Sequence, residues 1–531
     1  MTTRDAVAKP AAEPAPARGH RLDRFELAAL AALAGLSLLV LAALLTKGRA
    51  LTGADGLLAS DQLQYFTWIR QASEHWLVGN EYDLAPDDRV FLHPGFLLSG
   101  LVHAVSGMSV PLSYLLWKPV AVALLFWGVL RYVRRLLPAG GPRYAALVLG
   151  LFAVMPASAL VAWTGLGGRP RQYTFDFVAG ELSSAQYLWG YLMTAIAVAL
   201  MPLVLLAVEN WRTTRRPHTL VLASLGALLV TWLQPWQGGT LVLVVLGAEA
   251  LSRRRSSPWI LAVPAAACVP AAYYAALERT DAAWELAGKV NAAGTQITWS
   301  WPWWTVALTL APLALPAALA YRRPPRSWQE LALRAWPLAA LVVYLAPVGT
   351  FPYHAFQGMT IPLAVLAVQG VLSVWPRPRT AIVVACLALM VVPGTAHRFE
   401  VAVNSIRAAG DPYFVFDGEQ QALDALESHP RQGGVLAPAY AGHMIPYRTG
   451  REVYVGALSW TPGWERRVIE TRALFEGSMG PEEAQALARR SGARFAFVDC
   501  RPGQRDLRPL LAPLIKRARP FGCATLYELR G

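Results

Sequence analysis

The sequence has few charged residues and few cysteines for its length. Of 531 residues, 15% are Asp, Glu, Lys or Arg, and four are Cys. A soluble domain carries about a quarter charged residues, so this shortage, together with 55% hydrophobic residues, indicates a membrane protein. Four Cys without metal-type spacing exclude a disulfide scaffold and a cysteine-rich metal site.

Two further absences bear on function. No Gly-rich nucleotide-binding motif precedes a helix, which argues against a nucleotide-sugar donor bound in the cytoplasm. No internal repeat is found and few charges fall inside apolar runs, unlike the repeated halves and midplane charges of many transporters. The net charge of +14 would suggest nucleic acid in a soluble protein, but the Arg residues cluster beside apolar runs, so we expect no nucleic-acid partner.

The apolar runs and the Arg clusters together predict a topology. Residues 1–22 are expected to be a disordered cytoplasmic tail. The run from Glu26 to Leu45 is long enough to cross a bilayer and lacks a cleavage site directly after it, so we expect a retained helix. We predict about eleven spans. They lie near 26–45, 112–130, 144–162, 187–208, 219–233, 237–251, 257–277, 302–320, 335–350, 356–374 and 380–396.

In this arrangement every dense Arg cluster falls on the cytoplasmic side, as the positive-inside rule requires. The short apolar segment 92–106 is then an interfacial helix, because an additional span there would invert all later ones. The prediction is a transmembrane domain over 23–397, with a first outer loop at 47–111, and an extracytoplasmic domain over 398–531. The long or polar loops 47–111, 163–186 and 278–301 then share the outer face with the tail, which predicts chemistry at that face.

The tail alternates short strand-like runs with helical patterns, which predicts a small α/β domain. Asp417 is a plausible N-cap and Pro481 fits a first helical position. Expected strands lie near 434–437, 452–455, 494–498 and 524–529, and expected helices near 417–427, 464–475, 481–491 and 505–517. Cys500 and Cys523 both lie in this tail, where an oxidising compartment would permit a disulfide bond.

Asp61 is the candidate catalytic residue of the first outer loop. It stands at the mouth of a predicted helix in which Leu63, Phe66 and Ile69 recur at helical spacing. One interpretation is an N-cap, because an Asp there accepts backbone N–H bonds. The other is a general base, because a carboxylate can take the proton of an attacking hydroxyl.

Further polar residues of the outer segments are candidate substrate contacts. Arg169 and Arg171 lie on the face that normally avoids Arg, which fits either a phosphate clamp or ion pairs with Asp176 or Glu181. Lys118, near the outer end of the second span, either extends to the interface or meets a donor phosphate. His354 is either an interfacial residue or a substrate contact. The other candidates for substrate contact are Tyr65, His93, Glu181, Gln234 and Tyr353.

Three outer segments carry a resemblance to a known family. They are Ser60 to Tyr65, the turn Phe351 to His354 with the following Gln357 to Ala364, and a part of the tail with the runs Leu436 to Pro438, Ile445 to Arg451 and Tyr454 to Gly456. With the layout of spans, they resemble the GT-C superfamily of membrane glycosyltransferases, including uncharacterised bacterial members. The family's frequent Asp-x-Asp or Glu-x-Asp pair is absent at Asp61, so no metal site is assigned and a divalent cofactor stays open.

The resemblance implies a helical polytopic membrane enzyme of the bacterial cell envelope with a small extracytoplasmic domain. Its donor would be a polyprenyl-phosphate-linked hexose or pentose, and its acceptor a glycan, lipid or protein at the outer face of the cytoplasmic membrane. The alternatives are a transporter or flippase of a lipid-linked glycan, and a membrane scaffold without catalytic activity.

Overall fold

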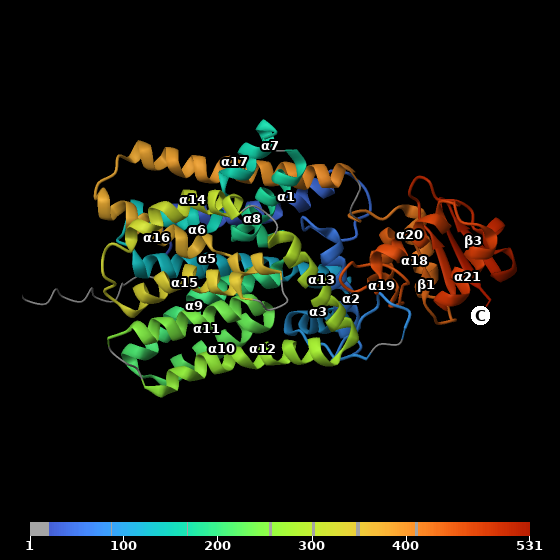
Figure 1. Cartoon of the computed structure of the whole chain (residues 1–531), viewed down its shortest axis with the longest axis horizontal. Coiled ribbons are helices and arrows are strands. Elements are labelled where there is room, and N and C mark those ends of the chain that lie inside the picture. The colour runs from blue at the N-terminus through green and yellow to red at the C-terminus, as the bar shows by residue number, and fades with distance from the viewer. Residues whose placement is uncertain are drawn as a thin grey trace, which may run out of the picture.

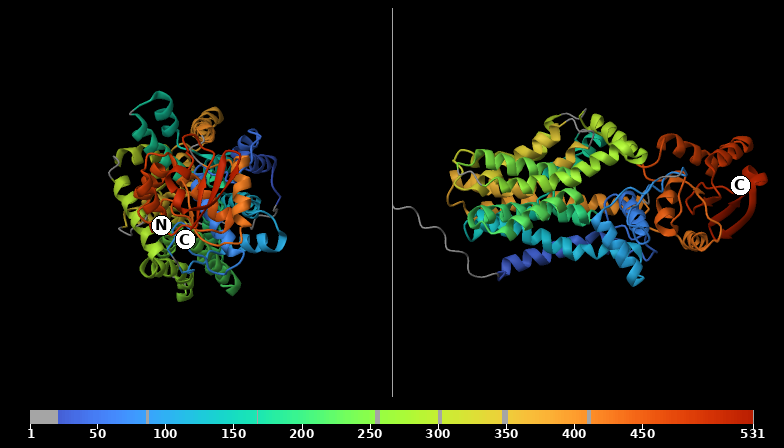
Figure 2. Two further views of the ribbon diagram at one scale, coloured as in Figure 1. Left: turned by 90° about the vertical axis from the view of Figure 1, so that its right-hand side faces the viewer. Right: turned by 90° about the horizontal axis from the view of Figure 1, so that it is seen from below.

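The chain folds into a long helical body with a smaller α/β region at one end (Figure 1). The computed structural model describes residues 21–85, 88–166, 168–253, 257–299, 303–346, 351–408 and 412–530. A view from below shows the same separation, with the C-terminal region lying beyond the end of the helices (Figure 2). The predicted class, a polytopic helical protein with a small C-terminal sheet, is confirmed.

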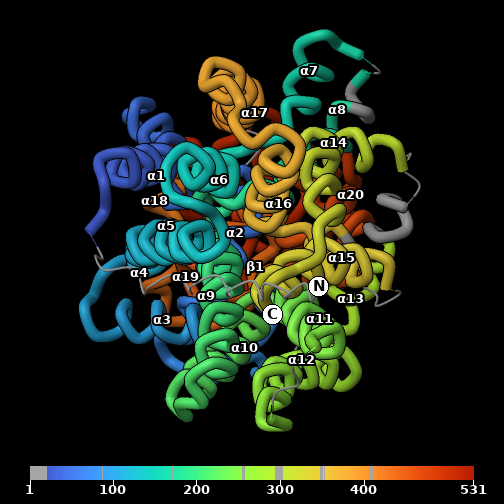
Figure 3. Tube along the Cα trace, turned by 90° about the vertical axis from the view of Figure 1, so that its left-hand side faces the viewer, coloured from blue at the N-terminus to red at the C-terminus, as the bar shows by residue number. Residues whose placement is uncertain are grey.

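Every predicted span coincides with helical structure, and the helices appear end-on when viewed along the long axis (Figure 3). The helices of the body are α1 (Arg24–Leu45), α4 (Val110–Leu115), α5 (Trp117–Leu136), α6 (Gly141–Phe152), α7 (Pro156–Thr164), α9 (Leu192–Thr214), α10 (Pro217–Leu233), α11 (Pro235–Leu251), α12 (Ala262–Thr280), α14 (Trp303–Ala320), α15 (Trp328–Leu345), α16 (Thr360–Val374) and α17 (Thr380–Ala408).

Among the described residues, six helices are long and apolar enough to cross a membrane, or seven if the bent pair α6 and α7 forms one span. The two halves of that pair meet at 54°. The other four predicted spans coincide with α10, α11, α15 and α16, which have 17, 17, 18 and 15 residues. The count of eleven therefore stays a prediction.

Glycines let helices of the body approach one another closely. A Cβ built on Gly370 of α16 would lie 1.9 Å from the carbonyl oxygen of Pro316 in α14. A Cβ on Gly128 of α5 would lie 2.5 Å from the carbonyl oxygen of Ala199 in α9. Both separations are too short for any side chain, so these helices pack backbone to backbone, as small residues allow in membrane bundles.

The segments expected to be outer loops contain helices of their own. The helix α2 (Ala59–Ala72) was expected, and α3 (Pro94–Ser106) is the predicted interfacial helix. At 13 residues, α3 is about 20 Å long, too short for a hydrocarbon core of about 30 Å. The segments 163–186 and 278–301 were expected to be loops, but they form α8 (Gly168–Leu182) and α13 (Ala282–Trp299). Short 3-10 turns, η1 (Ala185–Leu188) and η3 (Pro352–Phe356), complete this part, whereas η2 (Pro258–Leu261) leads directly into α12.

The C-terminal region is built on a four-stranded sheet with the order β1-β2-β4-β3. Its strands are β1 (Val435–Leu436), β2 (Phe495–Val498), β3 (Ile515–Phe521) and β4 (Ala524–Leu529). The β1–β2 pair is parallel, whereas β2–β4 and β3–β4 are antiparallel. Its helices are α18 (Asp417–Glu427), α19 (Ala439–Thr449), α20 (Trp464–Phe475), α21 (Pro481–Ser491) and α22 (Arg508–Leu511), with η4 (Ala512–Leu514).

Several predictions for the tail need correction. The run 452–455 makes one isolated bridge, Val435 to Val453, rather than a strand. The helix expected at 505–517 ends early, because β3 pairs with β4 across the turn at Gly522. The N-cap of α18 is Phe416 rather than Asp417, and the carboxylate of Glu419 accepts the Phe416 N–H at 3.1 Å. Pro481 is confirmed as the first residue of α21.

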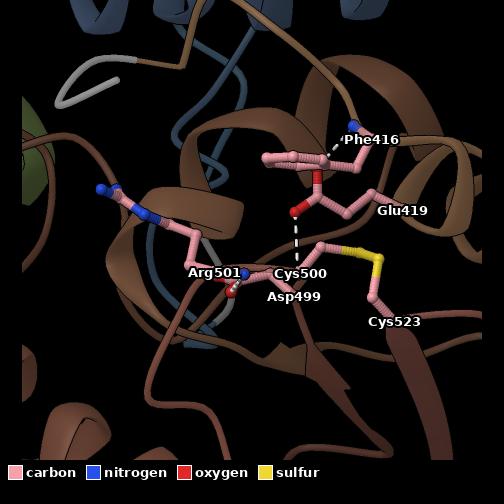
Figure 4. Close-up of a disulfide and its surroundings, with 6 residues drawn as sticks. All are labelled: Phe416, Glu419, Asp499, Cys500, Arg501 and Cys523. Atoms are coloured by element: carbon pink, nitrogen blue, oxygen red, sulfur yellow. Dashed lines mark hydrogen bonds between the residues drawn. A yellow bond between two sulfur atoms is a disulfide. The ribbon is translucent and has the colours of Figure 1, made fainter. Parts of the chain in front are cut away.

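A disulfide bond joins Cys500 and Cys523, as the sequence allowed (Figure 4). It ties the end of β2 to the start of β4, and the Cys500 N–H donates to the Glu419 carboxylate at 3.0 Å. The remaining cysteines, Cys268 and Cys386, are free. Since disulfides persist in oxidising compartments, the bond favours the predicted outer location of this region.

The topology is testable with alkaline phosphatase fusions. Gln234 directly precedes α11, and Arg255 follows it in the sequence, so truncated fusions after these two residues form a matched pair. The Arg clusters predict an active fusion after Gln234, an inactive one after Arg255 and an active one after Gly531. Phosphatase activity after Arg255 would contradict the assigned orientation.

Candidate functional site

A cavity of about 1000 Å³ lies where the helical body meets the C-terminal region. Its lining comes from the first outer loop, α8 with η1, the α10–α11 turn, α12 with α13, the η3 turn, α17 and residues 459–460 of the C-terminal region. The segments predicted to share one face therefore do meet at one end of the molecule. Of the candidate residues, Asp61, Tyr65, His93, Glu181, Gln234 and His354 line the cavity.

Asp61 is the third residue of α2 and faces the cavity. The N-cap of α2 is Leu58, so Asp61 is not the N-cap residue and lies instead in the first turn of the helix. The hydroxyl of Tyr191 donates to Oδ2 of Asp61 at 3.0 Å. Tyr191 directly precedes α9, so this bond joins the first outer loop to the helical body.

A second carboxylate, Glu181, lies in the same cavity near the end of α8. Its Oε2 accepts from the hydroxyl of Tyr187 at 3.1 Å and lies 3.2 Å from Nδ1 of His354. The amide of Gln357 lies 3.1 Å from the same His354 nitrogen, and Gln234 donates to Gln357 at 2.5 Å. Two sequence candidates, Gln234 and His354, thus belong to one set of polar contacts that reaches Glu181.

Tyr65 lies close to both carboxylates. Burial raises the pKa of its hydroxyl well above the usual range, and the negative charges of Asp61 and Glu181 raise that pKa further. Its ring stacks on Phe96 with centroids 5.2 Å apart. Tyr65 therefore stays a neutral hydroxyl, able to donate a hydrogen bond beside the two acids.

His93 has a structural part in the site. Its Nδ1 accepts from the Phe96 N–H at 3.3 Å, which caps the N-terminus of α3. Burial lowers the pKa of His93 to about 3, so the imidazole is neutral at pH 7. It can therefore shape the cavity but cannot offer a positive charge to a phosphate.

Arg398 of α17 is a cavity residue that the sequence analysis missed. Its side chain is 8% exposed, and its Nε donates to Oε1 of Gln186 at 2.8 Å. Its Nη1 donates to the backbone oxygen of Asp176 at 3.1 Å. Of the described residues that line the cavity, Arg398 is the only Arg or Lys. The signal that could have found it is an Arg at the outer end of an apolar run, where the positive-inside rule disfavours Arg.

Two candidates lie away from the cavity. Lys118 neither extends to the interface nor faces the site: its ammonium is buried, 2.6 Å from the Asp55 carboxylate, and donates to the backbone oxygens of Ser37 and Leu188. Tyr353 is fully buried, with its ring 5.3 Å from that of Tyr344. Both residues are corrected from substrate contacts to packing positions.

Arg169 and Arg171 belong to α8, but their side chains lie outside the described residues. The two acids proposed as their ion-pair partners have other contacts. Glu181 meets Tyr187 and His354, and Oδ1 of Asp176 lies 2.7 Å from Nε2 of His397. The phosphate clamp therefore stays a prediction.

A divalent metal is not supported by the residues present. Among the described residues, no group of three or more His, Cys, Asp or Glu side chains is placed to hold a metal ion. The carboxylates of the lining are Asp61, Asp176, Glu181 and Glu278. Asp61 and Glu181 accept from tyrosine hydroxyls, and Asp176 lies 2.7 Å from Nε2 of His397.

No protein-family model matches the chain, and no curated protein matches its sequence. Among solved structures, the chain is similar to arabinofuranosyltransferase AftD from Mycobacteria, with a TM-score of 0.53 at 14% identity, over 96% of this chain and 42% of that one. It also matches the Archaeoglobus fulgidus oligosaccharyltransferase, with a TM-score of 0.49 at 11% identity, over 89% of this chain and 69% of that one.

A third match is ArnT from Cupriavidus metallidurans bound to undecaprenyl phosphate, with a TM-score of 0.48 at 11% identity, over 94% of this chain and 97% of that one. At these identities the likeness concerns the fold. The match to AftD confirms the GT-C-like architecture that the sequence resemblance implied.

The buried ion pair between Lys118 and Asp55 should contribute to the stability of the fold. Removing it should have no direct effect on substrate binding. Lys118→Met should destabilise the protein by about 3–5 kcal/mol, because it leaves the Asp55 carboxylate buried without its cation. Lys47→Met, an exposed lysine at the end of α1, is the matched control and should change little. Thermal unfolding in detergent measures both.

The double variant Lys118→Met with Asp55→Asn should recover part of the loss, since the amide removes the buried charge. It can also keep the contact with Gln62, which donates to Asp55 at 3.1 Å. Equal stability of wild type and Lys118→Met would refute the structural role.

Proposed function

We propose that the chain is an integral-membrane glycosyltransferase that moves a sugar from a polyprenyl-phosphate-linked donor to an acceptor hydroxyl. The observation that carries the proposal is one cavity that brings together Asp61, Glu181 and Arg398. An acid to take a proton and a guanidinium to hold a phosphate are the groups this transfer needs. The fold shared with an arabinofuranosyltransferase supports the same reaction class.

The reaction is placed at the outer face of the cytoplasmic membrane. The positive-inside rule puts the cavity end of the molecule outside, and the Cys500–Cys523 disulfide suits an oxidising compartment. A lipid-linked donor suits an enzyme at this face, because its hydrocarbon chain stays in the bilayer while its phosphate and sugar reach the cavity.

Asp61 is the proposed general base. The acceptor oxygen attacks the anomeric carbon of the donor sugar, and the bond between that carbon and the phosphate oxygen breaks. The phosphate leaves with the electron pair, and the acceptor proton passes to the Asp61 carboxylate. Tyr191, which donates to Oδ2 of Asp61, holds that carboxylate in position.

Arg398 is the proposed phosphate-binding residue. As the leaving phosphate gains charge, a guanidinium in a water-poor cavity stabilises it more strongly than it would in water. The bonds to Gln186 and to the Asp176 backbone fix the side chain before the donor arrives. Such preorganisation lowers the cost of orienting the cation during the reaction.

Asp61→Asn tests the base. The amide keeps the shape and can still accept from Tyr191, but it cannot take a proton. We expect kcat for sugar transfer from a radiolabelled polyprenyl-phosphate sugar to fall about 100- to 10,000-fold, with donor binding retained.

Glu181→Gln and Asp176→Asn are the matched carboxylate controls in the same cavity. Each should lower kcat less than Asp61→Asn does, because neither acid is proposed to take the proton of the acceptor hydroxyl. Activity of Asp61→Asn within about twofold of wild type would eliminate Asp61 as the base. Turnover in detergent, without any gradient, also separates the enzyme from a transporter or flippase.

Arg398→Lys tests the phosphate contact. Lysine keeps the charge but loses the planar fork, so the donor KM should rise about tenfold or more if binding is bidentate. Arg216→Lys, on an exposed arginine at the far end of the helical body, is the control and should leave KM unchanged. An unchanged donor KM in Arg398→Lys, in a protein of normal stability, would argue that the residue only supports α8.

A further inference from the structure

One side of the cavity is an aromatic wall formed by Trp68, Phe91, Tyr274, Trp284 and Trp460. The ring centroids of neighbours lie close together: 4.9 Å for Trp68 and Phe91, and 4.8 Å for Phe91 and Trp284. Trp460 lies 5.2 Å from both Trp68 and Trp284. The wall is thus continuous from α2, through the first outer loop, to α12, α13 and the C-terminal region.

Trp460 is the only member of the wall supplied by the C-terminal region, and its position is fixed. Its backbone oxygen accepts from the side-chain amide of Asn80 at 2.8 Å. Within its own loop, the Gly456 N–H donates to Thr461, and the Trp464 indole donates to the Gly456 oxygen. These bonds hold the loop against the first outer loop, so the cavity is incomplete without the C-terminal region.

The two regions are also joined by charged and backbone contacts. Arg467 forms an ion pair with Asp83 at 2.7 Å, and the Val453 N–H donates to the Glu81 oxygen at 2.9 Å. On the other side of α2, Arg70 pairs with Glu427 at 2.7 Å. The placement of Trp460 is therefore part of the folded structure rather than an incidental approach of a loop.

The chemistry of the wall favours a carbohydrate. A sugar ring offers a face of C–H bonds that packs on an indole, and a rim of hydroxyls that needs polar partners. The cavity lining supplies both, because Gln64, Glu278, Asn291 and Ser459 join the aromatic residues. Pockets for polar ligands combine aromatic surface with a few placed polar groups in this way.

The same lining also contains small or aliphatic residues of α12, α13 and α15, namely Ala271, Ala287 and Val343, which lack hydrogen-bonding side chains. A polyprenyl chain needs only such apolar surface. It would make no use of the polar side chains of Gln64, Asn291 and Ser459 in the same lining.

We propose that the aromatic wall binds a carbohydrate acceptor, and that Trp460 makes the C-terminal region a determinant of acceptor specificity. This inference rests on the proposed glycosyl transfer, and it narrows the acceptor from glycan, lipid or protein to a glycan. The acceptor sugar lies on the wall with its reacting hydroxyl towards Asp61, and the donor phosphate lies towards Arg398.

The test measures binding by the full chain in lipid nanodiscs, without requiring turnover. The probes are a set of defined neutral oligosaccharides of hexoses and pentoses, an unstructured peptide, and undecaprenyl phosphate. Saturation-transfer NMR reports which sugar protons lie against aromatic rings. We expect at least one oligosaccharide to bind, with the strongest saturation on the C–H protons of one ring face.

Trp460→Ala should weaken that binding tenfold or more and Trp460→Phe about threefold, while undecaprenyl phosphate binding stays unchanged. Trp76→Ala, on a 73% exposed tryptophan of the same outer loop, is the control and should alter neither. The Phe variant retains ring packing, so a loss in both variants with normal thermal stability reports recognition rather than misfolding.

Three results would overturn the inference. These are binding of the peptide but no oligosaccharide, equal loss of undecaprenyl phosphate and oligosaccharide in Trp460→Ala, and unchanged oligosaccharide binding in that variant. Failure of the proposed function is distinguishable, because it would show as undecaprenyl phosphate that does not bind wild type, or as full transfer by Asp61→Asn.

Discussion

The buried ion pair between Lys118 and Asp55 holds the site together. Lys118 comes from α5, Asp55 from the first outer loop, and the same ammonium donates to the backbone of α1 at Ser37 and of η1 at Leu188. Taking two charges out of water is costly, so such a pair persists only where the geometry satisfies both partners. Here one cation joins its own helix, α5, to three other segments of the chain.

The Lys118–Asp55 pair also helps to position Asp61, because Gln62, the next residue in the chain, is bonded to Asp55. The Gln62 side chain accepts from the Asp55 and Gly56 N–H groups at 2.9 Å each and donates to the Asp55 carboxylate. This fixes the start of α2, one residue from the proposed base. From the other side, Tyr191 donates to Asp61 at the point where η1 leads into α9. The carboxylate is therefore held by two segments that the ion pair also fixes.

The cavity lining combines two kinds of chemistry. It contains acids, Arg398 and the polar contacts from Gln234 to Glu181, and it also contains the aromatic wall. The C-terminal region contributes to the wall through Trp460, which explains why it packs closely on the first outer loop. Because the site is built from both the helical body and the C-terminal region, recognition of the proposed acceptor depends on the folding of the whole chain.

Structural features that depend on the local sequence pattern were predicted well from the sequence. Long apolar runs gave helices at every expected span, and α20 and α21 have the predicted bounds. Prediction from the sequence failed where distant contacts decide the structure. The first residues of β3, 515–517, were assigned to a helix because only pairing with β4 makes them part of a strand. The amphipathic helices α8 and α13 were assigned to loops because the cavity they cover exists only in the folded protein.

By itself, the sequence determined the membrane class and the end of the molecule that carries the site, because hydropathy and Arg placement act locally through the cost of burying charge. The roles of individual charged residues were decided only by tertiary structure. Lys118 and Arg398 both lie near the outer ends of apolar helices and look alike in sequence. Packing brings Lys118 to the Asp55 carboxylate and leaves Arg398 facing the cavity, because the partner of a buried cation comes from segments distant in the chain.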